Sequence, residues 1–105
     1  MAQFDVHRNP TAARSGIPYL VIVQSQRFDS SARRVIVPLL LVDKVQSTKP
    51  FLTPLFVIEG HDVILNPLQL ASVRAEQLGE KVCSLADDSD RIIAAIDLLI
   101  SRAWG

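Results

Sequence analysis

The chain has 105 residues, 49% of them hydrophobic, and its eleven basic and eleven acidic residues cancel to a net charge of zero. This length predicts one domain, residues 1–105, and the charge balance argues against a nucleic acid as the main partner. A domain of this size buries only roughly two thirds of its unfolded surface. We therefore expect part of its apolar surface to meet a partner, most simply a second copy of the chain.

The sequence has the features of a cytoplasmic protein. Its first residues, Met1 to Asp5, show neither the basic leader nor the apolar run of a signal peptide. The longest apolar run, residues 35–42, is too short to cross a bilayer as a helix. Cys83 is the single cysteine, which excludes an internal disulfide, and it is expected to behave as a small buried hydrophobic residue. We expect no contact with a membrane.

Three strands are predicted in the first half of the chain. They are residues 3–7, 19–23 and 33–37, separated by a loop over 9–16 and a polar turn over 29–31. The first strand alternates, with Phe4 and Val6 facing inward. The second is apolar on both faces, which is typical of a central strand. The third is expected to stop at Pro38, because proline cannot donate a hydrogen bond to a ladder.

The second half predicts a hairpin, two weaker strands and a terminal helix. A polar loop over 43–50 precedes a hairpin of 55–58 and 62–65, weaker strands follow at 70–73 and 80–82, and the helix covers 87–103. One face of that helix carries the apolar stripe Ile92, Ile96, Leu99 and Ala103, with Ile100 at its edge. The pattern predicts a mainly β fold: a small antiparallel barrel or sheet with one C-terminal α-helix packed on it.

The end of the predicted helix carries the only tryptophan. If the helix continues to the end of the chain, Trp104 lies opposite the apolar stripe, in line with Asp97 and Ser101. An exposed aromatic ring at that position is typical of a protein–protein contact. If the helix instead ends after Arg102, the ring can fold back onto the core. Helical geometry alone leaves both readings open.

Little in the sequence indicates catalysis. His7 and His61 have no partners at the spacing of metal ligands, so each is expected at the surface or in a turn, since a zinc site needs three or four ligands. The isolated glycines exclude a phosphate-binding loop. The aspartates of residues 87–90 are typical of a helix start. Arg33 and Arg34, beside a turn, are expected to be solvated. We predict no catalytic residue, no metal and no cofactor.

Short segments in order along nearly the whole chain resemble the CcdB toxins of bacterial toxin–antitoxin modules. They are Gln3-Phe4-Asp5-Val6, Val21-Ile22-Val23-Gln24-Ser25, Arg33-Arg34-Val35-Ile36-Val37-Pro38-Leu39, Asp43-Lys44-Val45, Leu70-Ala71-Ser72-Val73, Leu78-Gly79-Glu80-Lys81-Val82, and Ala95-Ile96-Asp97-Leu98 with Trp104-Gly105. The most specific feature is the order of these segments: Val-Gln-Ser comes first, then Arg-Arg followed by an apolar triplet and Pro-Leu, and then a helix that ends near Trp-Gly.

This resemblance implies a CcdB-like fold: a small antiparallel β-barrel with a short accessory sheet and a C-terminal helix. It implies a homodimer with the helix ends near the two-fold axis. It also implies a toxin that is not an enzyme, binds the DNA gyrase A subunit and traps gyrase on cleaved DNA. A cognate antitoxin would neutralise it, and the toxin would contact operator DNA only together with that antitoxin.

The resemblance also assigns residues. In the family the terminal helix and its Trp-Gly ending contact gyrase, which carries over to Trp104, Gly105, Asp97 and Ser101. Arg27 and Phe28 occupy positions where family members often have two aliphatic residues, and they form a second part of the gyrase or antitoxin face. Phe28 keeps an apolar contact there, whereas Arg27 does not. The chain lacks the family's final isoleucine, and a two-residue extension at 101–102 would rotate the end by about 200°.

Two alternatives remain. An RNA-cleaving toxin on a related barrel would use an arginine and a hydroxyl residue, for which Arg33 or Arg34 with Ser30 or Ser31 are candidates. The neutral charge and the lack of a basic groove with stacking aromatics argue against it. A non-toxic homologue that only binds an antitoxin and acts as a co-repressor would carry the same residues.

Overall fold

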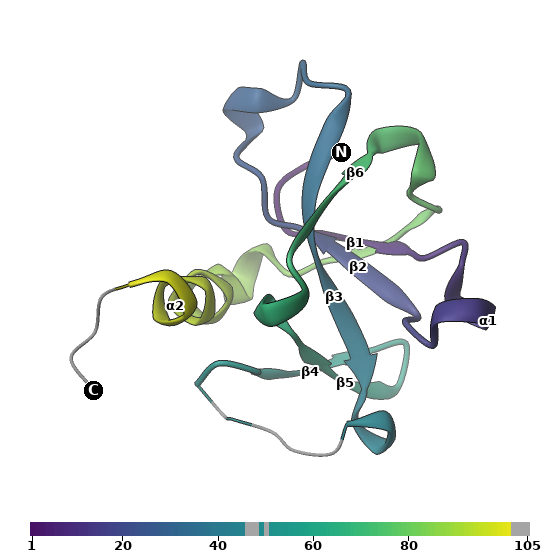
Figure 1. Cartoon of the computed structure of the whole chain (residues 1–105), viewed down its shortest axis with the longest axis vertical. Helices are drawn as coiled ribbons and strands as arrows, with labels where there is room; N and C mark the ends of the chain where they lie inside the picture. Colours follow the sequence, from purple (N-terminus) through teal and green to yellow (C-terminus); the bar gives the residue numbers. More distant parts are fainter. Residues whose placement is uncertain (46–48, 50, 102–105) are drawn as a thin grey trace.

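The computed structural model describes residues 1–45, 49 and 51–101. Within them, seven antiparallel strands form one sheet in the order β4-β5-β3-β2-β1-β7, and β6 also pairs with β3 (Figure 1). The strands are β1 (Asp5–Arg8), β2 (Tyr19–Ile22), β3 (Arg33–Leu41), β4 (Leu55–Ile58), β5 (His61–Leu65), β6 (Ala71–Arg74) and β7 (Lys81–Ser84). The helices are α1 (Ala12–Ser15) and α2 (Ser89–Ile100). The predicted class, a mainly antiparallel β fold with a C-terminal helix, is confirmed.

The central strand β2 is buried on both faces, as the sequence predicts. Its odd-numbered residues, Tyr19 and Val21, join the main core. Its even-numbered residues, Leu20 and Ile22, join a second apolar cluster. Since successive side chains of a strand point to opposite faces, the middle of the sheet is covered by apolar residues on both sides. The main core consists of Phe4, Val6, Tyr19, Val21, Val37, Leu39, Phe56, Ile58, Val63, Leu65, Leu85, Ile92 and Ala95.

The third strand continues through Pro38, so the predicted stop there is wrong. The carbonyl of Val35 accepts from the amide of Val23 at 3.0 Å, so odd-numbered residues of β3 direct their backbone groups toward β2. Pro38 therefore directs its backbone to the other side, where its carbonyl accepts from the Asn66 amide at 3.0 Å. On that side the partner changes from β6 to β5 through the 3₁₀ turn η3 (Pro67–Gln69). The N–H that proline lacks would lie at this change of partner, so its absence costs little stability.

The long strand β3 divides the sheet into two parts. Its first half pairs with β6, and its last residues, Leu39 to Leu41, pair with β5 of the hairpin (teal in Figure 1). The turn of that hairpin is Glu59 and Gly60, with φ of 52° and 79°, the left-handed pair that matches the twist of antiparallel strands. His61, which the sequence places in the turn, is the first residue of β5.

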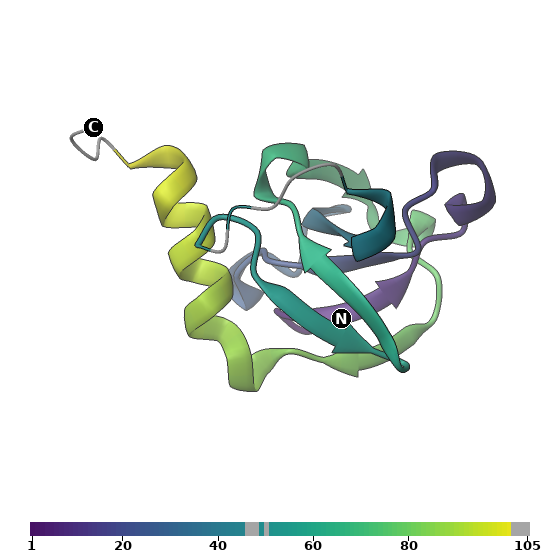
Figure 2. The same ribbon diagram turned by 90° about the horizontal axis from the view of Figure 1, so that it is seen from below.

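Helix α2 closes the main core. Ile92 and Ala95 are fully buried, while Ile96 and Leu99 are half-buried, so the predicted stripe is confirmed within the described residues. Figure 2 shows the helix (yellow-green to yellow) standing across one end of the strands. A helix this short is marginal on its own, so burial of this stripe, at about 25 cal/mol per Å² of apolar surface, supplies most of its stability.

The helix is shorter than predicted. The 3₁₀ turn η5 (Ala86–Asp88) precedes it, and Ser101 has an extended backbone with φ −73° and ψ 154°. The helix therefore ends at Ile100, and Ala103, the last residue of the predicted stripe, lies outside the described residues. A helical wheel consequently does not set the direction of Trp104. None of the helices described is long and apolar enough to cross a membrane.

The start of the chain also departs from the predicted boundaries. Phe4 is buried with φ 70°, and β1 begins only after it. The predicted loop over 9–16 contains the single helical turn α1, which ends at Gly16 with φ 73°. The predicted loop over 43–50 lies partly outside the described residues, and its first part forms the 3₁₀ turn η2 (Val42–Lys44).

His7 is buried, with 5% of its surface exposed, so the expected surface or turn position is wrong. Its Nδ1 lies 2.8 Å from the carbonyl oxygen of Gly79. A carbonyl only accepts, so the proton is on Nδ1, and the buried Nε2 has no hydrogen-bond partner. The strand backbone passes so close to Gly79 that a Cβ there would lie 2.7 Å from the Arg8 carbonyl oxygen. Only glycine permits this approach.

Candidate protein-binding face

One side of α2 exposes apolar side chains around a carboxylate. Ile93, Asp97 and Ile100 are spaced by four and three residues and therefore share this side of the helix. The exposed fractions of the two isoleucines are 46% and 71%, and Asp97 is also exposed. The Ser101 amide donates to the Asp97 carbonyl at 2.7 Å and completes the last turn. We call Ile93, Asp97, Ile100 and Ser101 the helix patch.

The structure places two of the four predicted gyrase-binding residues in this patch. Asp97 and Ser101 are exposed at the end of α2, as expected. Trp104 and Gly105 lie outside the described residues, so their assignment stays a prediction. The sequence reasoning missed Ile93 and put Ile100 at the edge of the core stripe. The available signal was their spacing around Asp97, since large exposed aliphatic side chains that cluster mark an interaction surface.

The opposite side of α2 faces the segment around Phe51 and Pro54, which precedes β4. Arg91 and Ala94, together with Phe51 and Pro54, line a hollow of about 320 Å³. The Arg91 guanidinium lies 4.4 Å from the centre of the Phe56 ring. Its Nη2 donates to the Leu55 carbonyl at 2.6 Å. Arg91 on this side therefore makes contacts within the chain, while Phe51 and Leu98 stay 86% and 46% exposed.

The second predicted contact region is the loop after β2. Arg27 and Phe28 belong to the 3₁₀ turn η1 (Gln26–Phe28), and both are exposed, Phe28 to 58%. The Ser25 hydroxyl accepts from the Arg27 amide at 3.3 Å and caps the turn. Figure 1 shows this loop and α2 in the same half of the molecule, with the loop above the helix. The hydrogen bonds and ion pairs of the described residues do not join them, so they are two separate parts of one side.

The arginine and hydroxyl residues considered for RNA cleavage do not come together as expected. Arg34 is 8% exposed, so the expected solvated position is wrong for it, and its guanidinium donates to backbone carbonyls. Arg33 is exposed, but its Nε donates to the Ser72 hydroxyl at 2.7 Å rather than to Ser30 or Ser31. Sequence separation hid this pairing, because Ser72 lies on β6.

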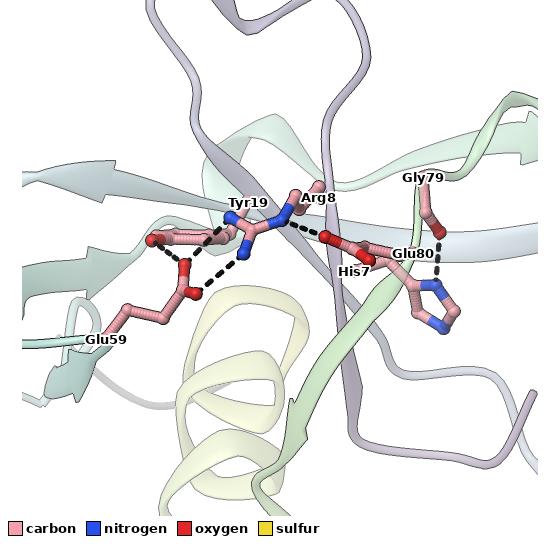
Figure 3. A network of polar contacts seen from close by, with 6 residues as sticks. All are labelled: His7, Arg8, Tyr19, Glu59, Gly79 and Glu80. Atoms are coloured by element: carbon pink, nitrogen blue, oxygen red, sulfur yellow. Dashed lines mark hydrogen bonds and ion pairs between the residues drawn. The ribbon is translucent and has the colours of Figure 1, made fainter.

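A network of charged side chains fastens the β4–β5 hairpin to β1 (Figure 3). The Arg8 guanidinium donates to both carboxylate oxygens of Glu59, at 2.8 and 2.6 Å, and to Glu80 at 2.6 Å. The Tyr19 hydroxyl also donates to Glu59, at 2.7 Å. The hydrogen bonds from Arg8 and then Tyr19 lower the pKa of Glu59 to about 2, from an ordinary value of 4.5. Burial, followed by the bond to Glu59, raises the pKa of Tyr19.

Acid is expected to loosen this network. Because the folded pKa of Glu59 is depressed, its contribution to stability is present above pH 4.5 and is lost as the pH falls toward 2. The Glu59→Gln variant should lose less stability over that interval than the unmodified chain. Urea unfolding of both proteins at several pH values measures this. Equal acid sensitivity of the Glu59 variant and the unmodified chain would contradict the role of the network.

The described residues offer little for chemistry. Across residues 1–45, 49 and 51–101, no three His, Cys, Asp or Glu side chains lie close enough together to hold a metal ion. Cys83 is half-buried against the main core, and burial raises the pKa of its thiol. A raised pKa disfavours the reactive thiolate. Large exposed apolar side chains, which suit binding, lie on α2 and in η1, and also at Phe51 and Val57.

Comparisons with known proteins agree with this architecture. The family model described as "CcdB protein" matches residues 3–101. No curated protein matches the sequence. A mycobacterial endoribonuclease, solved in complex with its cognate antitoxin, is similar with a TM-score of 0.73 and 15% identity over 100% of this chain and 99% of that one. A second mycobacterial endoribonuclease structure has the same TM-score and identity, over 100% of this chain and 95% of that one. At this identity the two structures show a shared fold.

Proposed function

The chain belongs to the CcdB family, and from this premise we propose that it is a toxin that binds the A subunit of DNA gyrase and traps the enzyme on cleaved DNA. The observation that carries the proposal is the helix patch at the end of α2. Two exposed isoleucines flank Asp97 there, immediately before the segment that contains Trp104 and Gly105. Family resemblance assigns the gyrase contact to this same stretch.

The patch suits binding rather than catalysis. Apolar contact with Ile93 and Ile100 supplies affinity, since each Å² of apolar surface removed from water contributes about 25 cal/mol before the costs of association. Asp97 supplies one charge that can pair with a cationic side chain and fix orientation. In this proposal the chain is not an enzyme, and gyrase itself breaks the DNA.

Three partners complete the proposal. A cognate antitoxin neutralises the toxin, and the pair binds operator DNA together. A homodimer brings the ends of two α2 helices near the two-fold axis. In support of the dimer, the turn η3 packs beside α2. Leu68 within this turn and Leu70 just after it are 61% and 42% exposed. They extend the apolar surface around the helix, which a second copy would cover.

Expression in growing cells tests the proposed function. Inducing the chain should stop growth, and co-expression of a toxin-resistant gyrase A subunit should restore it. Arrest that the resistant subunit does not relieve would contradict the gyrase target. Normal growth, with tight binding to an antitoxin, would favour the non-toxic co-repressor.

One observation supports RNA cleavage as a second candidate. The exposed pair of Arg33 and Ser72, with Nε and Oγ 2.7 Å apart, is the arginine-and-hydroxyl combination that this chemistry would use. The general base that attack by a ribose 2′-hydroxyl requires is not among the contacts of Arg33. Cleavage of a single-stranded RNA by the purified chain, lost in Arg33→Ala, would establish this candidate. Intact RNA after prolonged incubation would eliminate it.

A further inference from the structure

We call residues 25–32 the η1 loop; the side chains of Gln24 and Arg34, on either side of it in the chain, hold its backbone. Gln24 lies just before the loop, and its Nε2 donates to the carbonyls of Phe28 and Arg33, at 3.0 and 3.3 Å. Its Oε1 accepts from the Val35 amide at 2.9 Å. One amide side chain therefore closes the base of the loop.

Arg34, just after the loop, holds it more extensively. Its Nη1 donates to the Ser31 carbonyl at 2.6 Å and to the Arg33 carbonyl at 2.9 Å, and its Nη2 donates to the Asp29 carbonyl at 2.9 Å. The side chain is 92% buried, and its Nε has no partner, so the two Nη groups make all of these bonds. A lysine ammonium is a single point and cannot reproduce such a fork.

The backbone carbonyls of the loop therefore point toward Gln24 and Arg34, and the side chains of Arg27 and Phe28 are left exposed. Arg27 and Phe28 are exposed while the backbone around them is fixed at both ends. The Arg27 side chain has no ion pair or hydrogen bond among the described residues. Such a loop presents an exposed apolar ring beside a positive charge that has no ion pair among the described residues.

We propose that Arg34 is a positioning residue, which fixes the η1 loop so that Phe28 and Arg27 meet an apolar surface with a neighbouring carboxylate on the gyrase A subunit. The inference rests on the proposed function, because it takes gyrase as the partner. A prefolded loop binds without the entropic cost of ordering, whereas a loosened loop must be ordered on binding. Arg34 thus acts on affinity through Phe28 and Arg27 and not by touching gyrase.

A double-mutant cycle tests this mechanism. The dissociation constant for the purified gyrase A subunit is measured for the unmodified chain, Arg34→Lys, Phe28→Ala and the double variant. We expect each single change to weaken binding at least tenfold. The double variant should bind no more than threefold more weakly than Phe28→Ala, because without the Phe28 ring Arg34 has only Arg27 left to position. Arg74→Met, which removes an exposed arginine paired with Glu76, is the control and should not change affinity.

Trypsin provides a readout that does not depend on gyrase. Cleavage after Arg27 requires the loop to open locally, and it should be at least tenfold faster in Arg34→Lys than in the unmodified chain at temperatures where both are folded. Equal cleavage rates would overturn the positioning role. Full, independent losses in the double variant, or no loss in Phe28→Ala, would overturn the action through Phe28. If the unmodified chain does not bind gyrase at all, the proposed function fails, while the trypsin result still decides whether Arg34 fixes the loop.

Discussion

Removing Trp104 and Gly105 is expected to abolish binding to the gyrase A subunit and to relieve growth arrest, while the thermal midpoint stays unchanged. The main core of the described residues, which Ile92 and Ala95 complete, holds the fold. The family resemblance assigns the last two residues to the gyrase contact. Aromatic residues in such contacts commonly contribute 2 kcal/mol or more, so Trp104→Ala alone should weaken binding by about that amount.

Calorimetric titration of gyrase A with each variant measures this. Leu98→Ser is the control, because Leu98 is 46% exposed on the side of α2 that faces away from the helix patch. It should retain affinity. Undiminished binding by the truncated chain would show that the contact lies elsewhere on the surface.

Ile92→Ala is expected to be the most destabilising single change in α2. Ile92 has no exposed surface and packs in the main core. Its truncation should cost roughly 2–5 kcal/mol, since it removes apolar contacts and leaves a cavity. That is a large part of the roughly 5–15 kcal/mol by which a typical domain is stable.

The neighbouring residue, Ile93, provides a control in which binding is expected to change and stability is not. Ile93→Ala truncates the same residue type one position later, where the side chain is 46% exposed. It should leave the urea midpoint nearly unchanged but weaken gyrase binding, whereas Ile92→Ala should act chiefly on stability. If both variants unfold at the same urea concentration, the assignment of core and exposed sides of α2 is wrong.

The strands could be predicted because the sheet is covered by apolar residues in a regular pattern. The run from Tyr19 to Ile22 is apolar at every position and lies between two clusters, so its pattern alone identifies a central strand. Pro38 misled the prediction, because the rule for proline depends on which neighbour its backbone faces. That neighbour, Asn66, comes from a distant segment.

The burial of polar and charged residues was only partly predictable for a related reason. Arg34 looks like a surface charge in the sequence, and its burial depends on carbonyls that the folded loop supplies. His7 likewise is buried because the backbone at Gly79 approaches it across 72 residues. Asp97 and Ser101, in contrast, follow from helical spacing within one element. Local periodicity therefore predicts these two residues of the helix patch, and long-range packing determines the burial of Arg34 and His7.

Cleavage of supercoiled DNA by purified gyrase tests most directly whether the chain is a gyrase poison. The enzyme is incubated with plasmid DNA, ATP and the chain, and detergent and protease then release any trapped breaks. We expect linear DNA to accumulate with increasing amounts of the chain and not to accumulate with the variant that lacks Trp104 and Gly105. Unchanged DNA at saturating amounts of the intact chain would contradict the assignment as a gyrase poison.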